Sequence, residues 1–224
     1  EMKRNKILII SPHMDDEVLG CGGVIGKHRR EDAIWVVFVA HRAYNHFFST
    51  EKSSVEKSHA MNAKKVLRYH EAIFLDLADE RLDSCVQEII IPLEKLVEKI
   101  KPQIVYLPFR GDNNQDHRAV FDAARVVFRP AVSSFVKAMR MYEVPSSTEQ
   151  SPPLLESAFL PNYYADISGF LEDKIKAMKC YETERRGYPH PRSQEAIKIL
   201  AKKRGIEIGF KYAEAFMNIR ERWE

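Results

Sequence analysis

The segment ILIISPHMDDEVLGCGGVIG, residues 7–26, decides the fold. Its first four residues are all apolar and mostly β-branched, which predicts a short buried strand over 7–10. A polar turn follows at Ser11 and Pro12, and a helix is expected to begin immediately after it. A strand that leads through a tight polar turn into a helix is the opening unit of an α/β sheet, so we predict that fold class.

The pattern repeats over the first 130 residues. Short apolar runs predict buried strands over 34–40, 72–75 and 104–107. Beyond this stretch, an alternating run over 137–144 predicts an edge strand with one wet side. Apolar residues at helical spacing predict helices over 86–100, where Pro92 would kink the helix or start its second half, and around 119–127. We therefore predict a Rossmann-like, doubly wound, mostly parallel sheet of five or more strands with helices on both faces.

The pattern changes beyond residue 144. Several prolines mark a connection longer than usual, and such connections often carry functional residues. A helix is expected around 171–184, and another is expected between a capping Ser193 and Gly205. We predict a single domain over 1–224, in which 1–144 form the α/β core and 145–224 form an extension that supplies walls to the site.

Composition excludes several classes of protein. No apolar run approaches the roughly 20 residues that span a membrane, so we expect a soluble, cytoplasmic protein without a membrane partner. A net charge of +3 without a Lys/Arg-rich block argues against a nucleic-acid partner. The three cysteines are widely separated, which argues against a disulfide framework or a thiolate zinc site. The glycines at 20–23 lack the GxGxxG spacing of a dinucleotide-binding loop.

The first polar turn carries an unusual concentration of charge. His13, Asp15, Asp16 and Glu17 lie within five residues, and burying them together is costly unless a cation compensates. His13 and Asp16 are spaced so that both can face one point while Asp15 is directed elsewhere. A metal ion explains the cluster. The alternative is a solvated helix start, where the acids complement the helix dipole.

A second cluster, RGDNNQDHR over 110–118, follows the strand expected over 104–107. Both clusters therefore lie at the carboxyl edge of the sheet, where ligands bind in α/β folds. His13, Asp16 and His117 would then form a three-ligand site with a position open for water, as in catalytic zinc sites. Two imidazoles favour one Zn²⁺ per chain over Mg²⁺. The alternative for His117 is a surface histidine at the start of a helix.

These motifs carry a family resemblance. The segment 13–17, the glycines at 20–23 and Asp116-His117-Arg118 resemble the PIG-L/LmbE-like family of zinc-dependent N-acetylglucosaminyl deacetylases, and the likeness covers most of the chain. The resemblance implies His13, Asp16 and His117 as zinc ligands, Asp15 as the general base, and Asp116 as a residue that orients a ligand or a catalytic partner. It also implies a zinc-dependent hydrolase that removes an acetyl group from a small N-acetylated sugar or glycoconjugate.

The sequence departs from this family at one position that matters. Asn114 stands where relatives carry a histidine credited with stabilising the oxyanion or protonating the leaving amine. An amide donates a hydrogen bond but cannot deliver a proton. We expect either His190 to act as the acid or Asp15 to return the proton that it took. The alternative function is a metal-containing sugar-binding or scaffold module with little or no turnover.

Three further side chains are candidates for substrate binding. The planar forks of Arg110 and Arg192 suit a phosphate or carboxylate. Glu214 is a candidate for lining the pocket, and the alternative is an exposed or paired acid. The sequence leaves open which acylated substrate is used, whether the chain forms a homo-oligomer and whether the natural ion is zinc.

Overall fold

The computed structural model describes residues 4–43 and 52–223. Its strands are β1 (Lys6–Ser11), β2 (Ala33–His41), β3 (Glu71–Ala78), β4 (Ile104–Pro108), β5 (Ala138–Tyr142), β6 (Tyr163–Asp166) and β7 (Ala213–Glu221). Its α-helices are α1 (Asp16–His28), α2 (Lys52–Leu67), α3 (Val86–Ile100), α4 (Gln115–Val127), α5 (Leu171–Cys180) and α6 (Gln194–Ile206). Short 3₁₀ turns lie at Leu82–Ser84, Thr148–Gln150, Leu155–Ser157 and Glu182–Glu184.

The strands form one sheet in the order β3-β2-β1-β4-β5-β7-β6. The first five are parallel, and Leu8 of β1 pairs with Trp35 of β2 on one side and with Val105 of β4 on the other. The chain winds outward from β1 to β3 and then returns to β4, so the direction of winding reverses between β1 and β4. This confirms the Rossmann-like fold and makes the β1–β4 boundary the expected ligand site.

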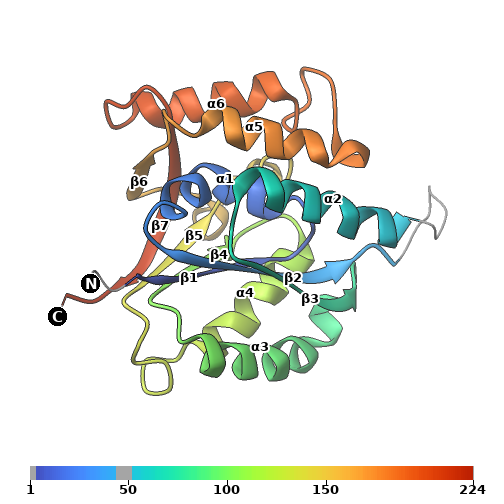
Figure 1. Ribbon diagram of the computed structural model, residues 1–224, viewed down its shortest axis with the longest axis vertical. Helices are drawn as coiled ribbons and strands as arrows, with labels where there is room; N and C mark the ends of the chain where they lie inside the picture. Colours follow the sequence, from blue (N-terminus) through green and yellow to red (C-terminus); the bar gives the residue numbers. More distant parts are fainter. Residues whose placement is uncertain (1–3, 44–51, 224) are drawn as a thin grey trace.

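Helices cover both faces of the sheet (Figure 1): α1, α2, α5 and α6 lie on one side, and α3 and α4 lie on the other. Alternate residues of β1 enter two separate cores. Ile7 and Ile9 pack under α1, whereas Leu8 and Ile10 pack against the side of α3 and α4. All four are fully buried, which explains why this strand reads as one continuous apolar run.

The prediction of an edge strand with one wet side is wrong for β5. This strand lies between β4 and the antiparallel β7, and all five of its residues are buried. Arg140 tolerates burial because its guanidinium lies 3.8 Å from the centre of the Tyr163 ring and 3.5 Å from the carboxylate of Glu221. The polar residue in the alternating pattern therefore faces β6 and β7 and not solvent.

Residues 145–224 contribute two strands to the sheet in addition to the predicted helices. The helix capped by Ser193 is confirmed as α6, since the Ser193 hydroxyl accepts a hydrogen bond from the Ala196 N–H at 3.1 Å. The helix expected to reach Glu184 ends at Cys180 and is followed by a 3₁₀ turn. Strands β6 and β7 were not predicted, and they complete the sheet. Among the described residues, no helix is long and apolar enough to cross a membrane.

Candidate metal centre

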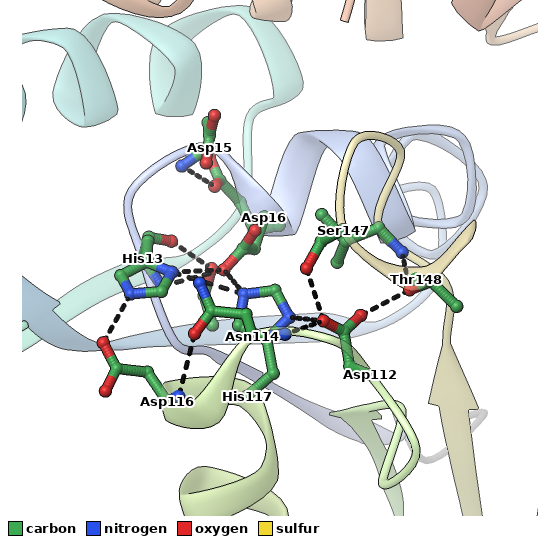
Figure 2. A network of polar contacts seen from close by, with 12 residues as sticks. His13, Asp15, Asp16, Asp112, Asn114, Asp116, His117, Ser147 and Thr148 are labelled. Carbon is green, nitrogen blue, oxygen red and sulfur yellow. Dashed lines mark hydrogen bonds and ion pairs between the residues drawn. The ribbon is translucent and has the colours of Figure 1, made fainter. Parts of the chain in front are cut away.

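His13, Asp16 and His117 converge at the carboxyl edge of the sheet, on the β1–β4 boundary (Figure 2). His13 belongs to the turn after β1, Asp16 begins α1, and His117 lies in the first turn of α4. The two parallel strands are neighbours, so the residues that follow them are brought together although about a hundred positions separate them in the sequence. Asp16 and His117 are each 1% exposed, which leaves His13 as the most accessible of the three.

The spacing of these three side chains fits a tetrahedral ion. His13 Nδ1 lies 3.3 Å from His117 Nε2, while Asp16 Oδ2 lies 3.4 Å from His13 Nδ1 and 3.2 Å from His117 Nε2. In a zinc site, bonds of about 2.0–2.1 Å at tetrahedral angles put neighbouring ligand atoms about 3.3 Å apart. Two nitrogens and one carboxylate oxygen at this spacing form one face of such a tetrahedron and leave its fourth corner open.

Each imidazole is backed by a carboxylate on its other nitrogen. Asp116 Oδ2 lies 2.9 Å from His13 Nε2, and Asp112 Oδ1 lies 3.4 Å from His117 Nδ1. Asp116 is fixed by the N–H groups of Glu80 and Leu82, which donate to its two oxygens at 2.7 and 3.2 Å. A carboxylate in this position selects the tautomer that directs the nitrogen lone pair toward an ion.

The centre is rich in buried negative charge. Burial alone lowers the pKa of His13, but hydrogen bonds to Asp116 and Asp16 outweigh it and raise that pKa to about 10. Burial also lowers the pKa of His117, but the charge of Asp16 and contacts with Asp112 raise it to about 9. Such imidazoles hold protons at neutral pH because the carboxylates require positive charge. A divalent cation supplies the same charge, so the donor set suits a metal ion.

Asp15 lies near the three converging side chains but is not one of them (Figure 2). Its carboxylate accepts a hydrogen bond from Arg192 Nη1 at 2.9 Å, and its backbone N–H donates to Glu17 at 3.2 Å. Burial raises the pKa of Asp15 to about 7, and the positive charge of Arg192 opposes that rise. Its φ of 138° is strained for a residue with a side chain. The turn thus directs one carboxylate into the centre and holds its neighbour beside it.

A family profile described as PIG-L, GlcNAc-PI de-N-acetylase, matches residues 8–128, which is more than half of the chain. The protein belongs to the PIG-L family. The match contains both polar clusters, from the strand that precedes His13 to the helix that carries His117.

The chain is also similar to named relatives, and it shares its fold with a solved structure. An uncharacterised deacetylase of Escherichia coli, YaiS, is 28% identical over 187 residues, covering 81% of this chain and 92% of its own length. A diacetylchitobiose deacetylase of Thermococcus kodakarensis is 26% identical over 195 residues, covering 80% and 70%. A 4-carboxy-2-hydroxymuconate hydratase from Pseudomonas putida shares the fold, with a TM-score of 0.78 and 19% identity over 98% of both chains.

Asn114, at the position where the resemblance implies a histidine, has a structural task in this protein. Asn114 caps α4, and its side-chain oxygen accepts a hydrogen bond from the Asp116 N–H at 2.8 Å. His190 is half-buried, and its Nδ1 accepts a hydrogen bond from the backbone N–H of Arg192 at 3.1 Å. Burial and the charges of Arg192 and Arg186 lower the pKa of His190. It is therefore neutral at pH 7 and poorly suited to donate a proton.

The three residues expected to bind substrate have different surroundings. Arg192 Nη1 contacts Asp15 and Glu184, and its Nε donates to Ser146. Arg110 is exposed after β4. The expectation for Glu214 is corrected, because it is buried and both of its oxygens are engaged. They accept the N–H groups of Gly23 and Val24 at 2.7 and 2.8 Å, and one pairs with Lys174 at 2.6 Å, so this acid ties α1 to β7 and α5.

Two residues of the centre were not singled out from the sequence. Asp112 is held by the hydroxyls of Ser147 and Thr148 and faces His117. Its position five residues before His117, inside the second polar cluster, could have identified Asp112 from the sequence. Glu184 joins Arg192 to Arg42 through contacts of 2.7 and 2.8 Å. No motif marked Glu184, because its partners come from distant parts of the chain.

Proposed function

We propose that this protein is a metal-dependent N-deacetylase that hydrolyses the acetamide of an N-acetylated amino sugar. One observation carries the proposal: His13, Asp16 and His117 are spaced at 3.2–3.4 Å as the face of a tetrahedral site, with the non-ligating Asp15 beside it. Deacetylases among the relatives, including one named for diacetylchitobiose, support the reaction. The fold by itself does not, since a hydratase shares it.

Zn²⁺ is the proposed ion, one per chain, because two imidazoles and one carboxylate match its preferred donors. When bound, such an ion polarises an amide carbonyl and makes a water molecule acidic near neutral pH. The chain contributes the orientation of the donors. Asp116 and Asp112 hold the two imidazole rings from behind, so the rings require no rearrangement when the ion arrives.

Asp15 is the proposed general base. It is 2% exposed, it is directed by Arg192, and its pKa of about 7 in the metal-free centre suits a group that accepts a proton at neutral pH. A nearby cation favours the ionised carboxylate, which is the form that accepts the proton. Asp15 then removes a proton from the attacking water.

The proton on the leaving amine is proposed to come from Asp15 as well. Asn114 has no proton to deliver and is engaged in capping α4, while the pKa of His190 is lowered. Asp15, after taking a proton from water, is the remaining acid beside the centre. The Asn114 amide N–H₂ is left to donate a hydrogen bond to the substrate, which preserves one part of the role of the family histidine.

The test is acetate release from a panel of N-acetylhexosamines and their conjugates by the zinc-loaded protein. We expect turnover with at least one sugar, loss of turnover in the presence of a chelator, and restoration by Zn²⁺. Asp15→Asn should lower kcat about 10²–10⁴-fold while retaining the metal, as expected for loss of a general base. Asp122→Asn, on the exposed surface of α4, is the matched control.

The alternative is a metal-containing sugar-binding module without turnover. If the natural protein releases no acetate from any sugar and Asn114→His creates activity, the module is the correct interpretation. Metal-dependent turnover by the natural protein excludes it.

A further inference from the structure

A basic cavity shares one residue, Arg192, with the surroundings of Asp15. It has a volume of about 260 Å³ and is lined by Met178, Lys179, Arg185, Arg186, Gly187, Arg192 and Gln194. All four ionisable side chains in this lining are cationic. The cavity is formed by the end of α5, the connection from α5 to α6, and the first residue of α6. In Figure 1 this connection lies above the sheet, on the face covered by α1 and α2.

The charges around this cavity favour an anion. Lys179, Arg185 and Arg186 are exposed, and Arg186 is held by hydrogen bonds from its Nη1 to the carbonyls of Thr183 and Arg185 at 2.8 and 2.9 Å. The cavity also contacts the amino end of α6, a helix of 13 residues, where backbone N–H groups and the helix dipole attract negative charge. No acid lines the cavity itself. Two acids contact its lining: Asp15 lies 2.9 Å from Arg192, and Glu184 lies 2.7 Å from Arg192 and 3.8 Å from Arg186.

Arg192 connects the cavity to the reaction site. Its Nη1 contacts Asp15 at 2.9 Å and Glu184 at 2.7 Å, and its Nε donates to Ser146 at 2.6 Å. These contacts fix the plane of the guanidinium, and its Nη2 makes no hydrogen bond to another described residue. Arg192 therefore lines the cavity and also contacts the proposed general base.

We propose that the cavity binds an anionic group, a phosphate or a carboxylate, on the N-acetylated sugar substrate. This inference rests on the proposed function and narrows it to acidic amino sugars. Arginine forks bind both groups through paired, charge-assisted hydrogen bonds. Arg185 and Arg186 contact the anion, Lys179 adds a third positive charge, and the sugar ring extends past Arg192 toward the metal centre.

The kinetic test compares matched substrates with the zinc-loaded enzyme. These are N-acetylglucosamine, its 1-phosphate, its 6-phosphate, and N-acetylmuramic acid, which carries a carboxylate. At least one acidic sugar should have a KM about tenfold or more below that of N-acetylglucosamine, and added salt should reduce the difference. The phosphate and carboxylate arms show which anion is preferred. If all four sugars are turned over with similar KM, the anion site is wrong and the deacetylase proposal stands.

Variants of the cavity residues test whether the preference for acidic sugars arises in this cavity. In Arg185→Ala/Arg186→Ala, the ratio of KM between neutral and acidic sugars should fall to within about threefold of one, since the paired contacts are lost. Lys179→Ala should reduce the ratio by a smaller factor. Lys176→Ala, exposed on the same helix α5, is the matched control and should preserve the ratio. An unchanged ratio in the double variant would place the selectivity elsewhere and overturn the proposal.

A binding measurement separates this inference from turnover. Glucosamine 6-phosphate, glucosamine 1-phosphate, muramic acid and glucosamine are titrated calorimetrically into the natural protein and the double variant. Tighter binding of an acidic amino sugar, lost in Arg185→Ala/Arg186→Ala, supports the site even if no acetate is released from any substrate. Equal binding of all four sugars by the natural protein rejects it.

Discussion

At the scale of single residues, the metal centre depends on the carboxylates that contact its two histidines on the side away from the ion. His117 directs Nε2 toward His13 and Asp16, while its buried Nδ1 lies 3.4 Å from Asp112. Burial raises the pKa of Asp112, but the contact with His117 and its charge, together with the hydroxyls of Ser147 and Thr148, which donate to Asp112, hold that pKa below its usual value. Asp112 therefore stays ionised, and its negative charge lies within ion-pair distance of His117 Nδ1.

Asp112→Asn tests this contact. The variant has one carboxamide oxygen in place of two carboxylate oxygens, and it removes the negative charge that stabilises the correct tautomer of His117. We expect zinc affinity to fall about 10–100-fold, the usual cost of losing a carboxylate behind a ligating histidine. Competition with a chromophoric chelator measures the affinity. Asp122→Asn serves again as the control, and an affinity equal to that of the natural protein would show that Asp112 does not support the ligand.

At the scale of elements, helix α1 is held unusually close to its neighbours. A Cβ at Gly20 would clash with the ring of Tyr142, and one at Gly23 would lie 2.5 Å from Ile167. Tyr142 cannot easily move, because its hydroxyl donates to the Ile10 carbonyl at 2.7 Å. The glycines thus have a packing role: they let the helix that begins with Asp16 lie directly against β5 and the residues after β6.

Gly20→Ala should destabilise the protein. Alanine improves helix propensity by up to about 1 kcal/mol, but forcing a methyl group into a packed core costs typically about 1–3 kcal/mol, and the rigid Tyr142 ring places this site at the upper end. Urea unfolding of the metal-loaded protein measures the change. Gly169→Ala is the control, since nothing lies within 4 Å of its added Cβ. Equal stability of the two variants would show that α1 can shift without cost.

At the scale of the whole molecule, metal and pH are coupled to folding. The chain has a net charge of +3, yet its centre buries Asp15, Asp16, Asp112 and Asp116, each at most 2% exposed. In the metal-free protein, the pKa values of His13 and His117 are raised to about 10 and 9, and those of Asp15 and Glu17 to about 7 and 8. The folded state therefore binds more protons than the unfolded state in neutral and mildly alkaline solution.

The metal-free protein should consequently lose stability as pH rises from 6 to 10. The histidines stabilise it fully below their unfolded pKa of about 6.5, and this contribution disappears as pH passes 9–10. The raised pKa values of Asp15 and Glu17 also make the stability fall as pH rises, but at lower pH than the histidines do. The pKa values of Asp112 and Asp116 are lowered, so their contribution to stability is lost only in acid.

The expected loss of stability is checked by measuring the Tm of chelator-treated and zinc-loaded protein between pH 6 and 10. A loss of about 2 kcal/mol would lower the Tm of a protein of this size by about 4–8 °C. Zinc should largely remove the alkaline loss, because metal binding requires neutral imidazoles and releases their protons. A metal-free Tm that stays constant or rises over this range would contradict the proton balance described above.

Local patterns predicted much of this protein. The apolar runs located β1 to β4, the helical spacings located α3 and α4, and the capping Ser193 located α6. Strands β6 and β7 escaped prediction because they are antiparallel and belong to a sheet whose other strands are far away in the sequence. Arg140 was misjudged for the same reason: its partners, Tyr163 and Glu221, lie on those two strands.

The sequence by itself determined the alternation of strands and helices and the two polar clusters that follow β1 and β4, because strand periodicity, turn residues and charge are local properties. Tertiary structure decided which polar side chains meet. Arg192 contacts both Asp15 and Glu184 in the folded protein. Asn114 caps a helix, and Glu214 forms a buried ion pair with Lys174. The physical reason is that charge pairing and burial depend on distances between segments that no local pattern encodes.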